Sequence, residues 1–445
     1  MKRRYFRNAV LFFAAMFLLF SPPAHAGRIA EREILPNGVT LLRSEKNVLP
    51  MVTVEVAVKA GSIFEPSEKA GLANLTADLL NEGTKRRTAG EISEEIEFVG
   101  GTLTASGGYD FITIKLTVLK KDIELGFDLI SDIILNPLFS PDEISRRKTM
   151  ISNAIIRQNE EPGVVASKAF LKAVYGDHPY GRMIEGTEET LDNITREDLV
   201  AFHEKYYAPN NSIMAVVGDI NKDELMTLLK RYFKDWRPRE IKTEIPPVPE
   251  FNRKRRVIRI NRNITQANII LGHPGIKRDS PDYYSVSVMN YILGGGGFAS
   301  RLMDNIRDDK GLAYDIYSYF FANKYAGSFR VELQTRNRSA NTAIDEVLKE
   351  MNRIRTEPVS RNELSDAKSY LTGSFPLRLD SNSKMAGFLI ATEYYGLGLD
   401  YAEDYRKFIN AVSRQDILEA ARKYLDTENY ILVVVGDIKK TELRY

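Results

Sequence analysis

The sequence predicts an α+β protein made of two similar domains in tandem, and three observations support this fold class. An internal repeat relates the two halves, strand patterns come in pairs with helix pairs between them, and a proline-rich charged segment separates the halves. Paired strands followed by paired helices are typical of an antiparallel-rich mixed sheet covered by helices. A tandem duplication then places one such domain in each half.

The repeat matches without a gap at a constant offset of 218 positions, as from Thr195 to Ser413. Each copy predicts a helix that begins at a capping Thr or Ser, ends at Lys-Tyr, and precedes an apolar strand ending at Gly-Asp. We expect these residues to be scaffold. The matched segments are 195–199 with 413–417, 205–206 with 423–424, and 216–220 with 434–438.

The segment 237–256 contains Pro238, Pro246, Pro247 and Pro249 among charged residues, which is typical of an exposed linker. We therefore expect a first domain over 27–236 and a second over 257–445. Turn, capping and alternation signals predict the elements of the first domain. These are a hairpin turn at 37–38, a strand at 52–58, one helix over 67–81, a helix from Thr88, a strand at 112–118 and a helix from Pro141.

Residues 1–26 have the pattern of a secretory signal peptide. Basic residues precede a short apolar run from Ala9 to Phe20, and Ala24-His25-Ala26 forms a cleavage site. The run is shorter than the roughly 20 apolar residues of a membrane-spanning helix, and no Cys follows it. We expect an exported protein that starts at Gly27, periplasmic in a Gram-negative source, with no membrane attachment after cleavage.

The charge balance excludes a nucleic-acid partner. Cleavage removes four of the 62 basic residues, which leaves 58 against 60 acidic residues. No basic stripe or binding motif is present. The chain contains no Cys, so disulfides are excluded.

The segment from Gly71 to Thr84 contains a motif without its functional residues. Gly-Leu-Ala at its start and Gly-Thr at its end resemble the frame around the H-x-x-E-H helix of the insulinase/pitrilysin (inverzincin) zinc peptidases. In that frame Asn74 replaces the first His, Ala77 replaces the Glu that activates water, and Asp78 replaces the second His. The resemblance implies a relative of these peptidases that has lost its own metal.

Zinc needs three protein ligands and an open position for water. The family's third ligand, a Glu about seventy-five residues downstream, would fall near 152–155, where the sequence reads Ser-Asn-Ala-Ile. After the leader only His178, His203 and His273 remain, and no H-x-x-x-H pair occurs. We expect these histidines to pack or cap, and we expect no metal or other cofactor in this chain.

A second specific pattern begins at the glycine run 294–297. No Gly-Lys-Ser/Thr follows it, which argues against a phosphate loop. Taken alone, Arg307 in the last turn of a helix ending at Gly311 and Tyr314 on the next strand suit packing roles. The Arg-x-x-x-Gly-Leu-x-Tyr pattern resembles the pair with which family members contact bound peptide. That resemblance implies a substrate-contact role for both residues, since Arg and Tyr donate hydrogen bonds to carbonyls.

The resemblance as a whole implies a non-catalytic, substrate-binding subunit of a two-chain zinc metallopeptidase. Its partner would be a homologous chain bearing H-x-x-E-H and the zinc, and its substrates would be unfolded peptides bound in extended form. Proteolysis would then need both chains. Two alternatives stay open: an inert scaffold of the same fold, and a periplasmic peptide-binding protein. The missing ligands argue against an autonomous protease.

Overall fold

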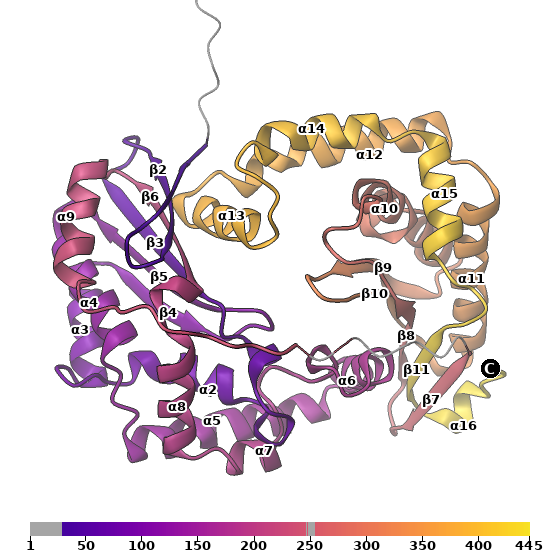
Figure 1. Ribbon diagram of the computed structural model, residues 1–445. Coiled ribbons are helices and arrows are strands. Elements are labelled where there is room, and N and C mark those ends of the chain that lie inside the picture. The colour runs from indigo at the N-terminus through magenta and orange to yellow at the C-terminus, as the bar shows by residue number, and fades with distance from the viewer. Residues whose placement is uncertain (1–28, 246, 248–253) are drawn as a thin grey trace, which may run out of the picture.

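The computed structural model describes residues 29–245, 247 and 254–445, and it contains two mixed β-sheets (Figure 1). In each sheet one pair of strands is parallel and the other pairs are antiparallel. The first sheet has the order β1-β2-β6-β3-β5-β4, with β1 (Glu31–Ile34), β2 (Thr40–Glu45), β3 (Met51–Val58), β4 (Thr102–Ser106), β5 (Ile112–Leu119) and β6 (Ser212–Gly218). The second has the order β7-β11-β8-β10-β9, with β7 (Arg256–Asn261), β8 (Gln266–Pro274), β9 (Ala313–Ala322), β10 (Gly327–Arg336) and β11 (Ile431–Gly436).

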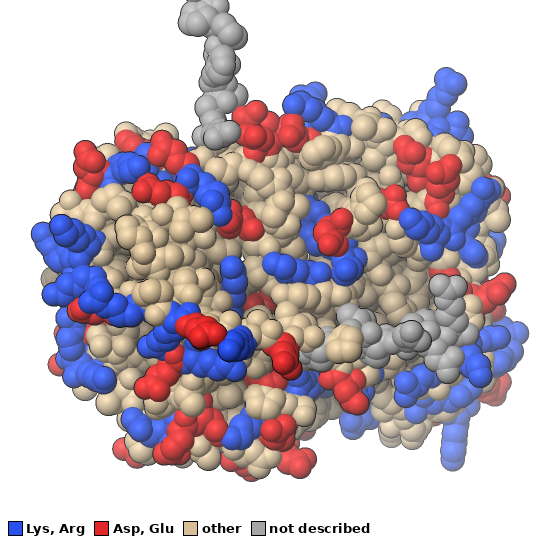
Figure 2. Space-filling model, in the orientation of Figure 1, with Lys and Arg blue, Asp and Glu red and all other residues tan. Residues whose placement is uncertain are grey.

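Helices cover the sheets in both halves. Those of the first half are α2 (Leu72–Asp78), α3 (Ala89–Phe98), α4 (Ile123–Leu135), α5 (Pro141–Glu160), α6 (Pro162–Tyr175), α7 (Glu188–Asp192), α8 (Arg196–Tyr206) and α9 (Lys222–Tyr232). Those of the second half are α10 (Tyr283–Asn290), α11 (Ala340–Thr356), α12 (Arg361–Ser374), α13 (Asn382–Tyr394), α14 (Tyr401–Ala411), α15 (Arg414–Tyr424) and α16 (Ile438–Thr441). No helix in the described part of the chain is long and apolar enough to cross a membrane. Figure 2 shows Lys and Arg side chains interspersed with Asp and Glu over the face in view.

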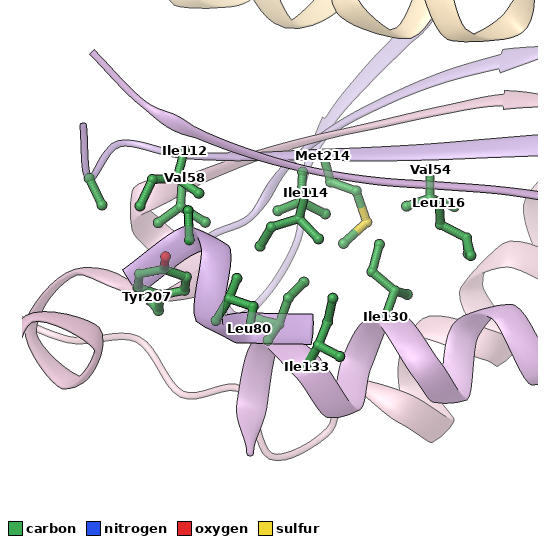
Figure 3. Packing of buried hydrophobic residues seen from close by; sticks show 14 of the residues in the cluster. Val54, Val58, Leu80, Ile112, Ile114, Leu116, Ile130, Ile133, Tyr207 and Met214 are labelled. Carbon is green, nitrogen blue, oxygen red and sulfur yellow. The ribbon is translucent and has the colours of Figure 1, made fainter. Parts of the chain in front are cut away.

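The core of the first half lies between the sheet and its helices. Figure 3 shows Ile114 and Leu116 of β5 pointing toward Ile130 and Ile133 of α4, and all four side chains are fully buried. The alternation of buried and half-buried residues along β5 follows from the two-residue period of a strand. Burial of each such side chain stabilises the fold by about 1.5–3 kcal/mol.

The duplication predicted from the repeat is present in the structure. Helices α8 and α15 both begin with a capping box, at Thr195 and Ser413, and both end at a Tyr. Each helix precedes a fully buried strand, β6 or β11, that occupies the same place in its sheet. The predicted α+β fold of two similar domains is therefore confirmed.

The two halves exchange helices. Helix α6 of the first half packs Phe170 and Val174 against β8 and β11 of the second sheet. Helix α13 of the second half packs Met385 and Leu389 against β3 and β6 of the first sheet. Figure 1 shows both crossings. Part of one face of each sheet is thus covered by a helix of the other half, so the halves cannot separate without exposing apolar surface on both sheets. The predicted domain ranges stay a prediction.

Several local predictions are confirmed, and one is wrong. The turn at Gly38, the capping box at Thr88 and the helix from Pro141 are present. The single helix expected over 67–81 is broken, because Gly71 adopts a left-handed φ of 103° and α2 begins only after it. A Cβ on Gly71 would lie 2.6 Å from the Glu185 carbonyl oxygen, so the close approach requires glycine.

The leader and the linker lie partly or wholly outside the described residues. The predicted leader, 1–26, falls outside them entirely, as do 246 and 248–253 of the predicted linker. Residues 237–245 contain no helix or strand, and β7 begins at Arg256, so the linker range stays a prediction.

Candidate functional site

Helix α2 carries the three positions at which the related peptidases hold their zinc ligands and base. Ala77 is fully buried in the core, while Asn74 and Asp78 are half-buried. The turn between β4 and β5 packs onto Asn74, since a Cβ on Gly107 in this turn would lie 2.7 Å from the Asn74 Cα atom. The helix therefore presents an amide and one carboxylate where the metal-binding motif needs two imidazoles and a base.

A cation from another helix lies near this carboxylate. Burial raises the pKa of Asp78, Arg147 of α5 opposes that shift, and Glu185 adds to it. Arg147 also forms an ion pair with Glu82, which Arg146 contacts from the same helix. The guanidinium thus provides positive charge close to where a metal would be expected, and a zinc ion beside it would be repelled. These residues do not fit a zinc centre.

The predicted third-ligand segment on α5 supplies no ligand. Ile155 is buried in the core, and the Ser152 hydroxyl lies 3.5 Å from a Glu188 carboxylate oxygen. No group of three His, Cys, Asp or Glu residues suited to a metal exists among the residues that the structure describes. The three histidines outside the leader are buried in structural roles; His203, for example, hydrogen-bonds the Ile134 carbonyl at 2.8 Å.

Sequence reasoning missed a buried carboxylate at the start of α2. Glu65 accepts hydrogen bonds from the backbone N–H groups of Gly71 at 3.0 Å and Ala73 at 2.8 Å. Burial raises the pKa of Glu65 to about 7, although the hydrogen bonds from Ala73 and Gly71 and the charge of Arg182 oppose the shift. Glu65 therefore caps the helix from six to eight residues upstream, too far for a local capping signal.

In the second half, a π-helical segment and a β-bulge carry the other predicted pair. Arg307 lies on the segment Met303–Asp309, and Tyr314 is the second residue of β9. The register between β9 and β10 shifts next to Tyr314, so that Ala313 and Ile316, three residues apart, are both buried. Such a bulge redirects side chains. Tyr314 is 84% exposed as a result.

The structure brings Arg307 and Tyr314 together. The Arg307 guanidinium lies 5.4 Å from the Tyr314 ring centroid and 4.6 Å from that of Phe298, which is itself exposed. The only ion pair described for Arg307 is with its neighbour Asp308, at 3.2 Å. No hydrogen bond of the Tyr314 hydroxyl is among those described. The pair therefore places the Tyr314 ring and hydroxyl at the surface with the half-buried Arg307 cation beside them.

The surrounding residues hold this segment in place. Arg301 donates two hydrogen bonds to Glu363 of α12, at 2.6 and 3.1 Å. Burial would raise the pKa of Glu363, but the bonds from Arg301 and the Ser360 backbone hold it at about 2. A Cβ on Gly294 would lie 2.6 Å from the Ser318 hydroxyl oxygen, so Gly294 allows close packing against β9.

The tandem α+β architecture and the α2 frame define a class, the two-domain relatives of zinc peptidases. Two family models match the chain: "Insulinase (Peptidase family M16)" over residues 41–188 and "Peptidase M16 inactive domain" over residues 193–371. The chain belongs to the insulinase family, peptidase family M16.

Similar proteins span nearly the same length. An uncharacterized zinc protease of Mycobacterium leprae is 31% identical over 368 residues, 80% of each chain. One from Rickettsia felis is 28% identical over 397 residues, covering 87% of this chain and 93% of that protein. The peptidase M16 inactive domain from Pseudomonas fluorescens superposes with a TM-score of 0.86 at 30% identity, covering 92% of this chain and 98% of that one. A Helicobacter pylori protease superposes with a TM-score of 0.84 at 22% identity, covering 91% and 99%, and shows the fold alone.

Proposed function

We propose that this chain is the non-catalytic, substrate-binding subunit of a two-chain zinc metallopeptidase of the insulinase family. One observation carries the proposal: the chain has no usable metal site on α2, yet on the second half it exposes Tyr314 with the half-buried Arg307 beside it. A partner chain with H-x-x-E-H would bind zinc and activate water. Arg307 and Tyr314 would hold the peptide carbonyl as negative charge develops on its oxygen.

The surroundings of Arg307 and Tyr314 support contact with a peptide that the partner chain cleaves. Tyr314 is 84% exposed, so its ring and hydroxyl are accessible to a second chain. The related proteins named zinc proteases support a peptidase context. The scaffold alternative needs no exposed Arg and Tyr, and a peptide-binding protein needs no partner. Reconstitution therefore separates the three functions.

The test is reconstitution with a homologous chain that bears H-x-x-E-H, encoded by the same organism. The single chain should contain no stoichiometric zinc and hydrolyse no peptide, whereas the mixture should cleave unfolded peptides in a chelator-sensitive manner. Arg307→Ala should weaken peptide binding, because a charged fork of donors is lost. One zinc per single chain together with chelator-sensitive cleavage would overturn the proposal.

We also propose that the protein is exported. Basic residues, a short apolar run and Ala24-His25-Ala26 support cleavage before Gly27. N-terminal sequencing of the protein from the producing cell should return Gly27 as its first residue. A protein that retains Met1 would contradict export by this route.

A further inference from the structure

One face of the second sheet is only half covered by the exchanged helix. Helix α6 lies on β8 and β11, and the neighbouring strands β10 and β9 extend beyond it (Figure 1). A Cβ on Gly272 of β8 would lie 2.8 Å from the Phe170 ring of α6, so the Cβ direction at Gly272 points to the face of the sheet that α6 covers. Gly272 pairs with Arg330 of β10, which pairs with Tyr319 of β9. Tyr319 therefore lies on the α6 side of the sheet.

Aromatic rings line this uncovered part of the face. The ring centroids of Tyr317 and Tyr319 are 6.2 Å apart, and those of Tyr319 and Phe321 are 5.6 Å apart. Tyr319 is 37% exposed and Phe321 is 40% exposed. The Arg330 guanidinium lies 4.6 Å from the Phe321 ring centroid and pairs with Glu332. We call Tyr317, Tyr319 and Phe321 the aromatic ladder. The charge of Arg330 is thus paired with that of Glu332, while Asp315, two residues before Tyr317, adds a negative charge near Tyr319.

The equivalent face of the first half shows that the fold does not require these rings. There, α13 covers β3 and β6, and β5 and β4 lie beyond it. The Lys115 side chain of β5 contacts Ser383 of α13, so Lys115 lies on the face of the first sheet that α13 covers. On that side of β5 and β4, apart from Leu119 at the end of β5, the other residues carry hydroxyl groups: Thr102, Thr104, Ser106, Thr113 and Thr117. Two copies of one architecture therefore differ in chemistry at this place, and only one is aromatic.

The ladder is continuous with the proposed substrate contact. Tyr314 and Tyr319 belong to the same strand, five positions apart, or about 16 Å along an extended chain. Successive rings of the ladder are two residues apart, which matches the spacing of alternate side chains in an extended peptide. A peptide whose carbonyl contacts Tyr314 can therefore place a side chain on the ladder about five residues away.

We propose that the aromatic ladder is a specificity subsite that binds apolar and aromatic side chains of the extended peptide held by Arg307 and Tyr314. The inference rests on the proposed function and adds a side-chain preference to it. Rings in offset or edge-to-face contact contribute about 0.5–1.5 kcal/mol beyond the area they bury. A peptide with Phe at the ladder position therefore binds about 3- to 10-fold more tightly than the same peptide with Ser there.

The test pairs two peptides with one double variant. The two peptides differ only at one position, five residues from the cleaved bond, which is Phe in one and Ser in the other. That position is placed on the N-terminal or the C-terminal side of the bond, whichever gives the larger difference in KM between the two peptides with the wild-type complex. Tyr319→Thr with Phe321→Thr removes two rings but keeps β-branched side chains on the strand. In the reconstituted complex this variant should raise KM about 3- to 10-fold for the Phe peptide, leave its kcat within about twofold, and leave the Ser peptide unaffected.

The matched control is Phe408→Ala on α14, since Phe408 is similarly exposed, at 39%, and stacks on Tyr284 away from the ladder. It should alter neither peptide's KM. Equal losses for both peptides, or no loss for either, would overturn the subsite. If the double variant no longer co-elutes with the partner, the ladder is a subunit contact and the subsite is wrong.

A binding measurement separates this inference from the proposed function. The fluorophore-labelled Phe and Ser peptides are titrated into the single chain, without partner or zinc, and compared by anisotropy. Preference for the Phe peptide that the double variant loses supports the subsite even if the complex proves inactive. Equal affinity of the wild-type chain for both peptides contradicts the subsite, even if the complex is active.

Discussion

The α2 region contacts the edge strand β4 of the first sheet, and Tyr314 lies on the edge strand β9 of the second, yet the polar groups of the two regions have different surroundings. In the first, Ala77 is buried, and Asp78 and Glu82 lie near Arg147. In the second, Arg307 contacts mainly rings and Tyr314 is exposed. Removing one member of a buried pair leaves the other uncompensated, which is costly, whereas groups near the surface remain available to a ligand. Under the proposed function, the first region is structural and the second contacts substrate.

The largest effect should follow from Ala77→Glu, which restores the residue that the peptidases use as a base. Ala77 is fully buried, so the new carboxylate would have no partner. We expect a loss of about 3–5 kcal/mol in the free energy of unfolding, measured in urea. Tyr314→Ala, the control at the exposed pair, should change it by less than about 0.5 kcal/mol. A loss below about 1 kcal/mol for Ala77→Glu would show that α2 still has room for a catalytic base.

The two regions should also respond to pH in opposite directions. The pKa of Glu65 is raised to about 7, so its contribution to stability is full below about 4.5 and is lost as the pH rises through 7. The difference in unfolding free energy between wild type and Glu65→Gln should shift by up to about 3 kcal/mol between pH 5 and pH 8. Parallel pH curves for the two proteins would contradict the buried cap.

Glu363 provides the comparison in the second half. Its pKa is lowered to about 2, so the stability it contributes is present above about 4.5 and is lost as the pH falls through 2. Glu363→Gln should therefore destabilise the protein at neutral pH and have little effect at pH 2. If Glu363→Gln instead stabilised the protein at pH 7, the account of the Arg301 pair would be wrong.

A smaller effect is expected at Arg147. Arg147→Met keeps an apolar stem but leaves Asp78 and Glu82 with less positive charge nearby. We expect a loss of about 1–2 kcal/mol in the free energy of unfolding at pH 7. Arg307→Met should cost less than about 0.5 kcal/mol, because its ring contacts are exposed. Equal losses for the two variants would remove the distinction between the regions.

The sequence predicted the parts of this account that depend on local patterns. The 218-residue repeat, the capping boxes at Thr195 and Ser413, and the missing ligands at Asn74, Ala77 and Asp78 are visible as spacing. The resemblance of the segment 71–84 to the zinc-binding helix of the insulinase-like peptidases correctly predicted the family. The roles of Arg307 and Tyr314 stay a prediction, although the structure brings the two side chains together.

Features that depend on distant partners could not be predicted. The apolar side of α6 carries no signal that it packs on the second sheet instead of its own. Arg147 lies about seventy residues from Asp78 in the sequence, and its charge acts on Asp78 only because α5 packs against α2. The bulge before Ile316 follows from pairing with β10, and no turn residue marks it. The short strand β4 was not predicted, because only two of its five residues, Leu103 and Ala105, are apolar and it follows two glycines.

The most direct test of the central claim is the single-turnover rate of peptide cleavage by the complex of this chain with an H-x-x-E-H partner. Tyr314→Phe removes one hydroxyl and little volume, so the subunits should co-elute as in wild type while the rate falls about 100-fold, the scale for losing one donor to an oxyanion. Tyr370→Phe, which alters another exposed tyrosine, on α12, should leave the rate unchanged. Full activity of the assembled Tyr314→Phe complex would contradict the account and favour the scaffold.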